Sequence, residues 1–107
     1  MAAKSYTPAT RESARLLGLR VRLGRLEKRW TLAELAQRVG VSERTIANVE
    51  RGDLGVALGT VLEAAVLVGV ALFHPDDDRR RLESARVSDY LTLLPRTVRP
   101  SPVDDDF

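Results

Sequence analysis

The sequence contains no cysteine, one histidine and few aromatic residues, and each shortage removes a class of function. Without cysteine, disulfides and thiolate metal sites are excluded, which fits a reducing compartment, so we expect a cytoplasmic protein. The aromatic content of 5% indicates a core built from Leu, Val and Ala. This composition favours helices over sheet.

Long apolar segments are also missing. The longest run, residues 64–73 (AAVLVGVALF), is about half the length that a membrane-spanning helix needs. It therefore predicts a buried or interface segment, and no membrane partner. The N-terminus has no charged segment followed by an apolar run, so we expect no signal peptide.

Residues suited to catalysis are scarce. The chain has no glycine-rich phosphate loop, and its single histidine, His74, precedes Pro75 in a predicted turn. Ser42 has no base nearby in sequence and is explained as a helix cap. The acidic triplet at residues 76–78 suits the positive end of a helix better than a metal, because consecutive side chains point in different directions. We expect no enzyme, no catalytic residue, no metal and no cofactor.

Charge is distributed unevenly, although the net charge is only +2. Residues 1–52 contain eleven Lys or Arg against five Asp or Glu, whereas residues 53–107 contain six against ten. A basic half predicts a nucleic-acid partner, although solvated helix surfaces also explain it.

Apolar spacing and capping residues predict an all-α fold of five helices. Leu16, Leu19, Leu23 and Leu26 recur at spacings of three and four on the first helix, and Leu17 and Val21 lie on another face, so this helix is expected to bury two faces. The expected helices run from Thr7–Pro8 to about 28, over 32–39, from 43 to before Gly52, over 58–68, and from the acidic triplet to before Pro95. Thr10 is an alternative cap for the first of them. The fourth is nearly all apolar and is expected to be buried almost all round.

Two of these helices are short and joined by a tight turn. Thr31 and Glu34 form a capping box at the start of the first, Gly40 ends it, and Ser42 caps the second. This spacing is that of a helix-turn-helix, in which the second helix enters the major groove while the first crosses the phosphate backbone.

The string TLAELAQRVGVSERTIANVERG resembles the core of the Xre-type, phage-repressor-like helix-turn-helix family. The resemblance covers residues 16–70. It implies a five-helix phage-repressor-like domain with a short C-terminal tail, divided into a flexible arm at 1–7, a DNA-binding domain at 8–73, a C-terminal helix at 74–95 and a tail at 96–107. Two positions depart from the family: Leu32 stands where a phosphate-holding Gln is usual, and Ala57 where a hydroxyl cap is usual.

The same resemblance implies site residues. Glu43, Arg44 and Asn48 would face the groove, Thr45 and Arg51 would lie near phosphates, and Arg25 would pair with Glu50. The implied DNA-binding residues are Thr31, Ser42, Glu43, Arg44, Thr45, Asn48 and Arg51. Glu43 has two explanations: a first-turn acid stabilises the helix dipole, and a carboxylate in the groove accepts from cytosine N4.

The expected function is sequence-specific repression of transcription by a homodimer at a palindromic operator. Its interface is expected on the apolar surface of the fourth helix and in the strand-like segment 70–73, at Val70, Leu72 and Phe73. The C-terminal part is similar to HipB-type antitoxins, which implies a HipA-like kinase toxin as partner, with Phe107 as its anchor. The alternatives are a stand-alone regulator without a toxin, and an interaction scaffold that no longer binds DNA.

Overall fold

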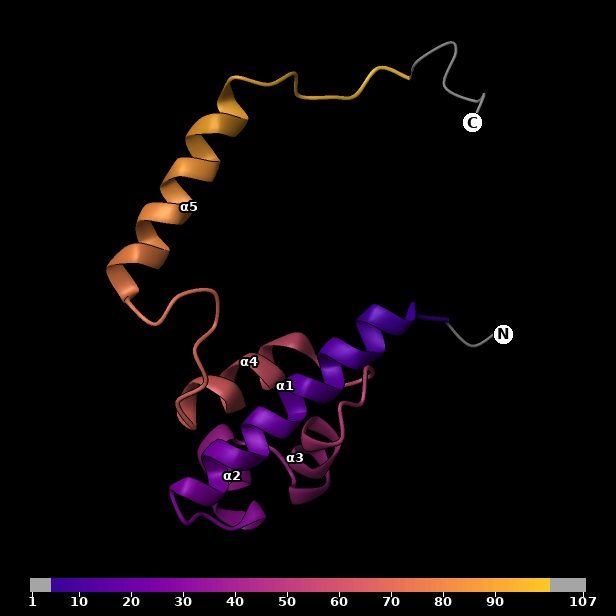
Figure 1. Cartoon of the computed structure of the whole chain (residues 1–107), viewed down its shortest axis with the longest axis vertical. Helices are drawn as coiled ribbons and strands as arrows, with labels where there is room; N and C mark the ends of the chain where they lie inside the picture. The colour runs from indigo at the N-terminus through magenta and orange to yellow at the C-terminus, as the bar shows by residue number, and fades with distance from the viewer. Residues whose placement is uncertain (1–4, 101–107) are drawn as a thin grey trace. The chain divides into compact units, whose positions relative to one another are not determined.

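The computed structural model describes residues 5–100 and, within them, contains helices and no strand. The helices are α1 (Pro8–Glu27), α2 (Leu32–Val39), α3 (Glu43–Glu50), α4 (Leu58–Leu67) and α5 (Asp77–Thr92), shown in Figure 1. The all-α class expected from the sequence is confirmed. The chain forms two compact units, Met1–Leu72 and Phe73–Phe107, which are described separately.

Helices α1, α2, α3 and α5 begin where a side chain accepts a hydrogen bond from a free backbone N–H group. Thr7 accepts from the Thr10 N–H at the start of α1, and Ser42 accepts from the Thr45 N–H at 3.1 Å at the start of α3. The capping box of α2 is complete, since Glu34 N–H donates to Thr31 and Thr31 N–H donates to Glu34, each at 3.0 Å. Hydrogen bonding to Thr31 lowers the pKa of the Glu34 carboxyl. These starts are local, so the sequence predicted those of α2 and α3 correctly. At α1 the sequence left Thr7 and Thr10 as alternative caps, and the cap is Thr7.

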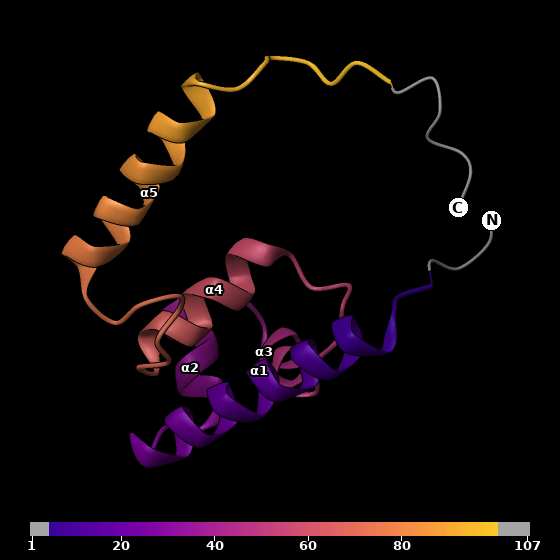
Figure 2. The same cartoon turned by 45° about the horizontal axis from the view of Figure 1, so that its top comes forward.

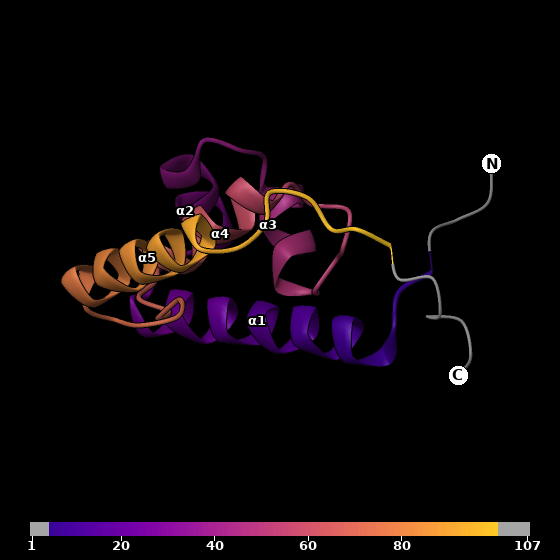
Figure 3. The same ribbon diagram turned by 90° about the horizontal axis from the view of Figure 1, so that it is seen from above.

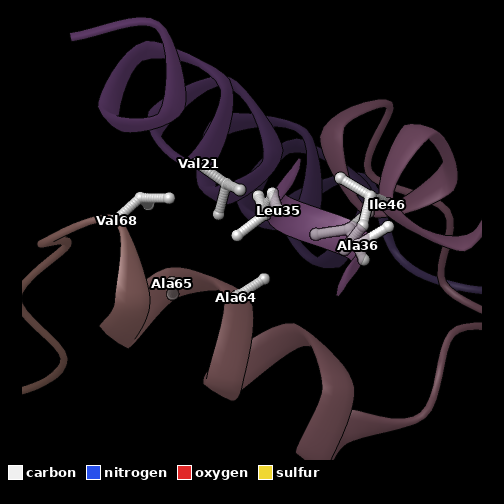
Figure 4. Close-up of a cluster of buried hydrophobic side chains, with 8 residues drawn as sticks. Val21, Leu35, Ala36, Ile46, Ala64, Ala65 and Val68 are labelled. Atoms are coloured by element: carbon white, nitrogen blue, oxygen red, sulfur yellow. The ribbon is translucent and has the colours of Figure 1, made fainter. Parts of the chain in front are cut away.

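The core of the first unit lies between α1, α2, α3 and α4. Its largest fully buried side chains are Leu35, Ile46 and Val21, which lie close together in Figure 4. The smaller Ala64 and Ala65 approach them from α4. The other helices of this unit lie on one side of α1 (Figures 2 and 3), so α1 buries one face.

The leucine stripe of α1, which consists of Leu16, Leu19, Leu23 and Leu26, is exposed. Each of these side chains is between 49% and 58% accessible. The expectation that α1 buries two faces was therefore wrong. Its buried residues are Gly18, Val21, Gly24 and Arg25, on the opposite side of the helix. The buried side is the face that Val21 and Leu17 indicated, and Gly18 and Gly24 extend it by admitting a neighbouring backbone.

Helix α4 is less buried than its composition suggests. Ala64 and Ala65 are buried, but Leu58 is 72% and Val66 58% exposed, which corrects the expectation of burial all round. Only one layer of helices packs on α4 in this unit, so its outer side faces solvent. The segment after it, expected to be strand-like, has no regular structure, and Phe73 has a positive φ of 64°.

Helix α5 is described by itself. It begins at the Asp76 cap, as the acidic triplet predicted, and contains no buried residue. Its first turns carry the ion pairs Arg80–Asp77 and Arg81–Asp78 on the surface. Solvent screening makes such exposed pairs weak.

Candidate nucleic-acid interface

The turn between α2 and α3 is built by Gly40 and Val41. Gly40 has a φ of 89°, a left-handed conformation that ends α2. The N–H groups of Gly40 and Val41 both donate to the Ala36 carbonyl, at 2.8 and 3.0 Å. This compact turn leaves only Ser42 before α3 starts, and it fixes the direction of the second helix relative to the first.

Helix α3 has one buried and one open face. Ile46 and Val49 are buried, whereas Glu43 and Arg44 are exposed and Asn48 is half-buried. With 3.6 residues per turn, Arg44, Asn48 and the capping residue Arg51 share the open face. A major groove admits a helix, and Arg and Asn side chains are donors of the kind that contact base edges there.

Ala47 lies on the same face and was missed by the sequence interpretation. It is half-buried and stands between Arg44 and Arg51 on consecutive turns. Helical periodicity alone places Ala47 on this face, but the sequence interpretation considered only the polar side chains of the helix. Its methyl group is of the kind that contacts thymine C5-methyl groups.

The far end of α3 is held by an ion pair. Arg25 Nε donates to Glu50 Oε2 at 2.7 Å and Nη2 donates to Oε1 at 3.0 Å, while Nη1 donates to the Trp30 carbonyl at 2.9 Å. The two side chains are only 9% and 7% exposed. Hydrogen bonding to Glu50 raises the pKa of the Arg25 guanidinium, so it stays charged. The structure thus joins α1, the start of α2 and the end of α3 through one guanidinium.

Two glycines bring the end of α3 against α1. A Cβ on Gly18 would lie 2.5 Å from the Val49 carbonyl oxygen, and one on Gly52 would lie 2.7 Å from Arg15 Cα. Gly52 also has a φ of 78°, which disfavours other residues. Neither contact is local in sequence, and together with the ion pair they set where the open face of α3 stands.

Asn48 and Arg51 interact on the open face. Arg51 Nη2 donates to the Asn48 side-chain carbonyl oxygen. This contact uses the Asn48 side-chain oxygen, and the amide hydrogens take no part in it. The pair also links the open face of α3 to its C-terminal cap.

The other implied DNA-binding residues lie at helix starts. The hydroxyl groups of Ser42 and Thr45 form a hydrogen bond of 2.9 Å between their oxygens, so both residues belong to the cap of α3. Thr31 is exposed, and its hydroxyl accepts from the Glu34 N–H. Leu32 is half-buried against the core, and no side chain caps α4 at Ala57.

The implied interface residues differ in their exposure. Val70 and Leu72 are half-buried and pack against the core, while Phe73 is fully exposed. Phe107 lies outside the described residues. The structure therefore leaves Phe73 as the one member of this set with a fully accessible side chain among residues 5–100.

The described residues offer neither a metal site nor a membrane-spanning helix. Within residues 5–100, no group of three His, Asp or Glu side chains is placed to hold a metal. His74 Nδ1 accepts from the Asp76 N–H at 3.0 Å, which is a turn interaction. None of the described helices is both long and apolar enough to cross a membrane.

Comparison with known proteins defines the class. Residues 16–82 match the family described as "Helix-turn-helix domain". The chain is also 30% identical over 78 residues to a protein named "Neisseria hypothetical transcription factor" from Neisseria meningitidis serogroup B, covering 70% of this chain and 74% of that protein. No solved structure matches the chain. The chain belongs to the helix-turn-helix domain family.

Proposed function

We propose that the chain is a sequence-specific, double-stranded DNA-binding regulator of transcription, with α3 as its recognition helix. The observation that supports it most directly is the open face of α3, which carries Arg44, Ala47, Asn48 and Arg51. This face is held on a rigid frame by the Arg25–Glu50 pair and the close glycine contacts. Family membership and the named function of the Neisseria relative point the same way.

The proposal assigns a DNA contact to Glu43, Arg44 and Asn48 on α3 and to residues at the helix ends. Arg44 donates to guanine, and Asn48 offers amide hydrogens to an acceptor on a base edge. Glu43, exposed at the first helical position, accepts from cytosine N4 and also suits the helix dipole. Thr31, Ser42, Thr45 and Arg51 lie at helix ends, from which phosphates are usually held.

The test is the replacement of Arg44 by alanine. We expect a loss of about 1–3 kcal/mol in binding free energy at the preferred site, with a smaller loss on random DNA, because a bidentate base contact carries specificity. Arg44→Lys is the matched control: it keeps the charge and loses the planar fork. The measurement is fluorescence anisotropy on both DNAs at one salt concentration. Equal losses on both DNAs, restored by lysine, would make Arg44 a phosphate contact only.

We also propose that the protein binds as a homodimer through the segment that ends at Phe73, with half-sites about one helical turn apart. Accessible apolar side chains support this in each unit taken by itself: Leu58 and Val66 on α4 in the first, and Phe73 at the start of the second. Phe73→Asp is expected to give a monomer by light scattering and to weaken binding to a two-half-site DNA. Leu72→Asp is a poorer choice because Leu72 packs against the core. A dimer of unchanged mass would move the interface elsewhere, with the leucine stripe the next candidate.

A finer proposal concerns the partner. We propose that this regulator is the antitoxin of a toxin–antitoxin pair, represses its own operon and docks a HipA-like kinase with its C-terminal tail and Phe107. The support is the resemblance of the C-terminal sequence alone. A stoichiometric kinase that purifies with the protein from its own cells, and is lost on deletion of residues 96–107, is the expected result. Its absence would leave the stand-alone regulator.

A further inference from the structure

An open cleft of about 440 Å³ lies where the N-terminal half of α1 meets the end of α3. Its lining residues are Pro8, Arg11, Glu12, Arg15, Arg51, Gly52 and Leu54. Three guanidinium groups and one carboxylate therefore share one depression. We refer to it as the arginine cleft.

The arginines of this cleft are not neutralised by the protein. Arg11, Arg15 and Arg51 are exposed, and the three ion pairs formed within residues 5–100 involve none of them. Arg11 and Arg15 are separated by one turn of α1, so their side chains project to the same side. Like charges gathered at one place repel, and an anion bound among them removes that repulsion.

The geometry of the cleft is fixed by backbone contact. The turn at Gly52 lies directly on the backbone of Arg15, so close that a Cβ on Gly52 would meet Arg15 N at 2.8 Å. Arg51 is thereby held beside α1. Because Arg51 also contacts Asn48, the cleft adjoins the open face of α3.

We propose that the arginine cleft binds a phosphate of the DNA backbone, so that the DNA interface extends from α3 to the N-terminal half of α1. The proposal rests on the proposed DNA-binding function and adds Arg11 and Arg15 to its residues. A guanidinium is suited to this ligand, because its fork of N–H donors matches a phosphate. Such contacts set the position of α3 on the duplex and carry no sequence information.

Salt dependence tests this assignment. A lost phosphate contact lowers the slope of log affinity against log salt by about 0.9, so Arg11→Ala/Arg15→Ala, which removes the contact to one phosphate, is expected to lower it by about 0.9. Between 50 and 200 mM salt, the unchanged protein should then lose about 3.5-fold more affinity than the double variant. The losses should be equal on preferred and random DNA. Arg20→Ala/Arg22→Ala is the matched control, with the same charge change on the same helix at residues that do not line the cleft.

The possible outcomes distinguish a wrong assignment of the arginine cleft from a wrong assignment of the DNA-binding function. An unchanged slope in the Arg11/Arg15 variant, or an equal fall in the control, overturns the cleft assignment while specific binding by the unchanged protein still supports the regulator. No binding of DNA by the unchanged protein removes both. An unchanged slope together with calorimetric binding of inorganic phosphate that is lost in the Arg11/Arg15 variant would reassign the cleft to a small anion. Circular dichroism checks that each variant is folded.

Discussion

A Glu50→Ala variant is expected to lose about 3–5 kcal/mol of the free energy of unfolding, because it leaves the Arg25 charge buried without its partner. Both side chains are less than one-tenth exposed, and two of the three Arg25 hydrogen bonds end on Glu50. A domain of this size is stable by about 5–15 kcal/mol, so the loss is a large part of the total. Urea denaturation measures it.

Two controls isolate the buried charge. Asp77→Ala breaks an exposed pair with Arg80 and is expected to change the free energy by about 0–1 kcal/mol. Arg25→Met/Glu50→Leu removes both charges and is expected to recover most of the loss, since well-packed apolar replacements of a buried pair are often neutral. A loss of under about 1 kcal/mol in Glu50→Ala would show that Arg25 reaches water without cost.

Gly52→Ala is expected to destabilise the fold by about 2–5 kcal/mol. The left-handed conformation contributes about 1–2 kcal/mol for a residue with a Cβ, and the overlap with the Arg15 backbone contributes about 1–3 more. Because a backbone atom cannot rotate away as a side chain does, the turn must move off α1. The variant is therefore expected to weaken DNA binding as well, by shifting the end of α3.

Gly69 provides the matched control. Its φ of 86° is similar, but nothing lies within 4 Å of a Cβ built there. Gly69→Ala is expected to show only the conformational part, about 1–2 kcal/mol. Equal losses in the two variants, measured by thermal or urea unfolding, would mean that the contact between Gly52 and Arg15 relaxes freely.

The sequence predicted best what short stretches of chain determine. The caps at Thr31 and Ser42 act over three residues, and they gave the starts of α2 and α3 correctly. The cap of α1 is Thr7, one of two candidates, and the acidic triplet at residues 76–78 indicated the start of α5. The Arg25–Glu50 pairing was implied by family resemblance, because nothing in the local pattern of either residue names the other.

What the sequence did not predict depends on contacts between distant segments. Gly18 and Gly24 lie on the buried face of α1, yet glycine has no side chain and does not contribute to a hydrophobic pattern. The pattern therefore predicted burial of the leucine stripe, which is exposed. The arginine cleft was missed because Arg15 and Arg51 are joined only through the close approach of Gly52. The exposure of α4 follows from the number of helices that cover it, which no single segment encodes.

Substitutions on the two sides of α1 are expected to have different effects, because the leucine stripe on the outer side is exposed. Changes on the inner side, at Val21 or Gly18, alter the frame that holds α3. Polar replacements at Leu19 or Leu23 reach no buried neighbour, and surface substitutions of this kind usually change stability by less than about 0.5 kcal/mol. The outer side therefore tolerates substitutions that leave the position of α3 unchanged, and one helix carries a side that stabilises the fold and a side that does not.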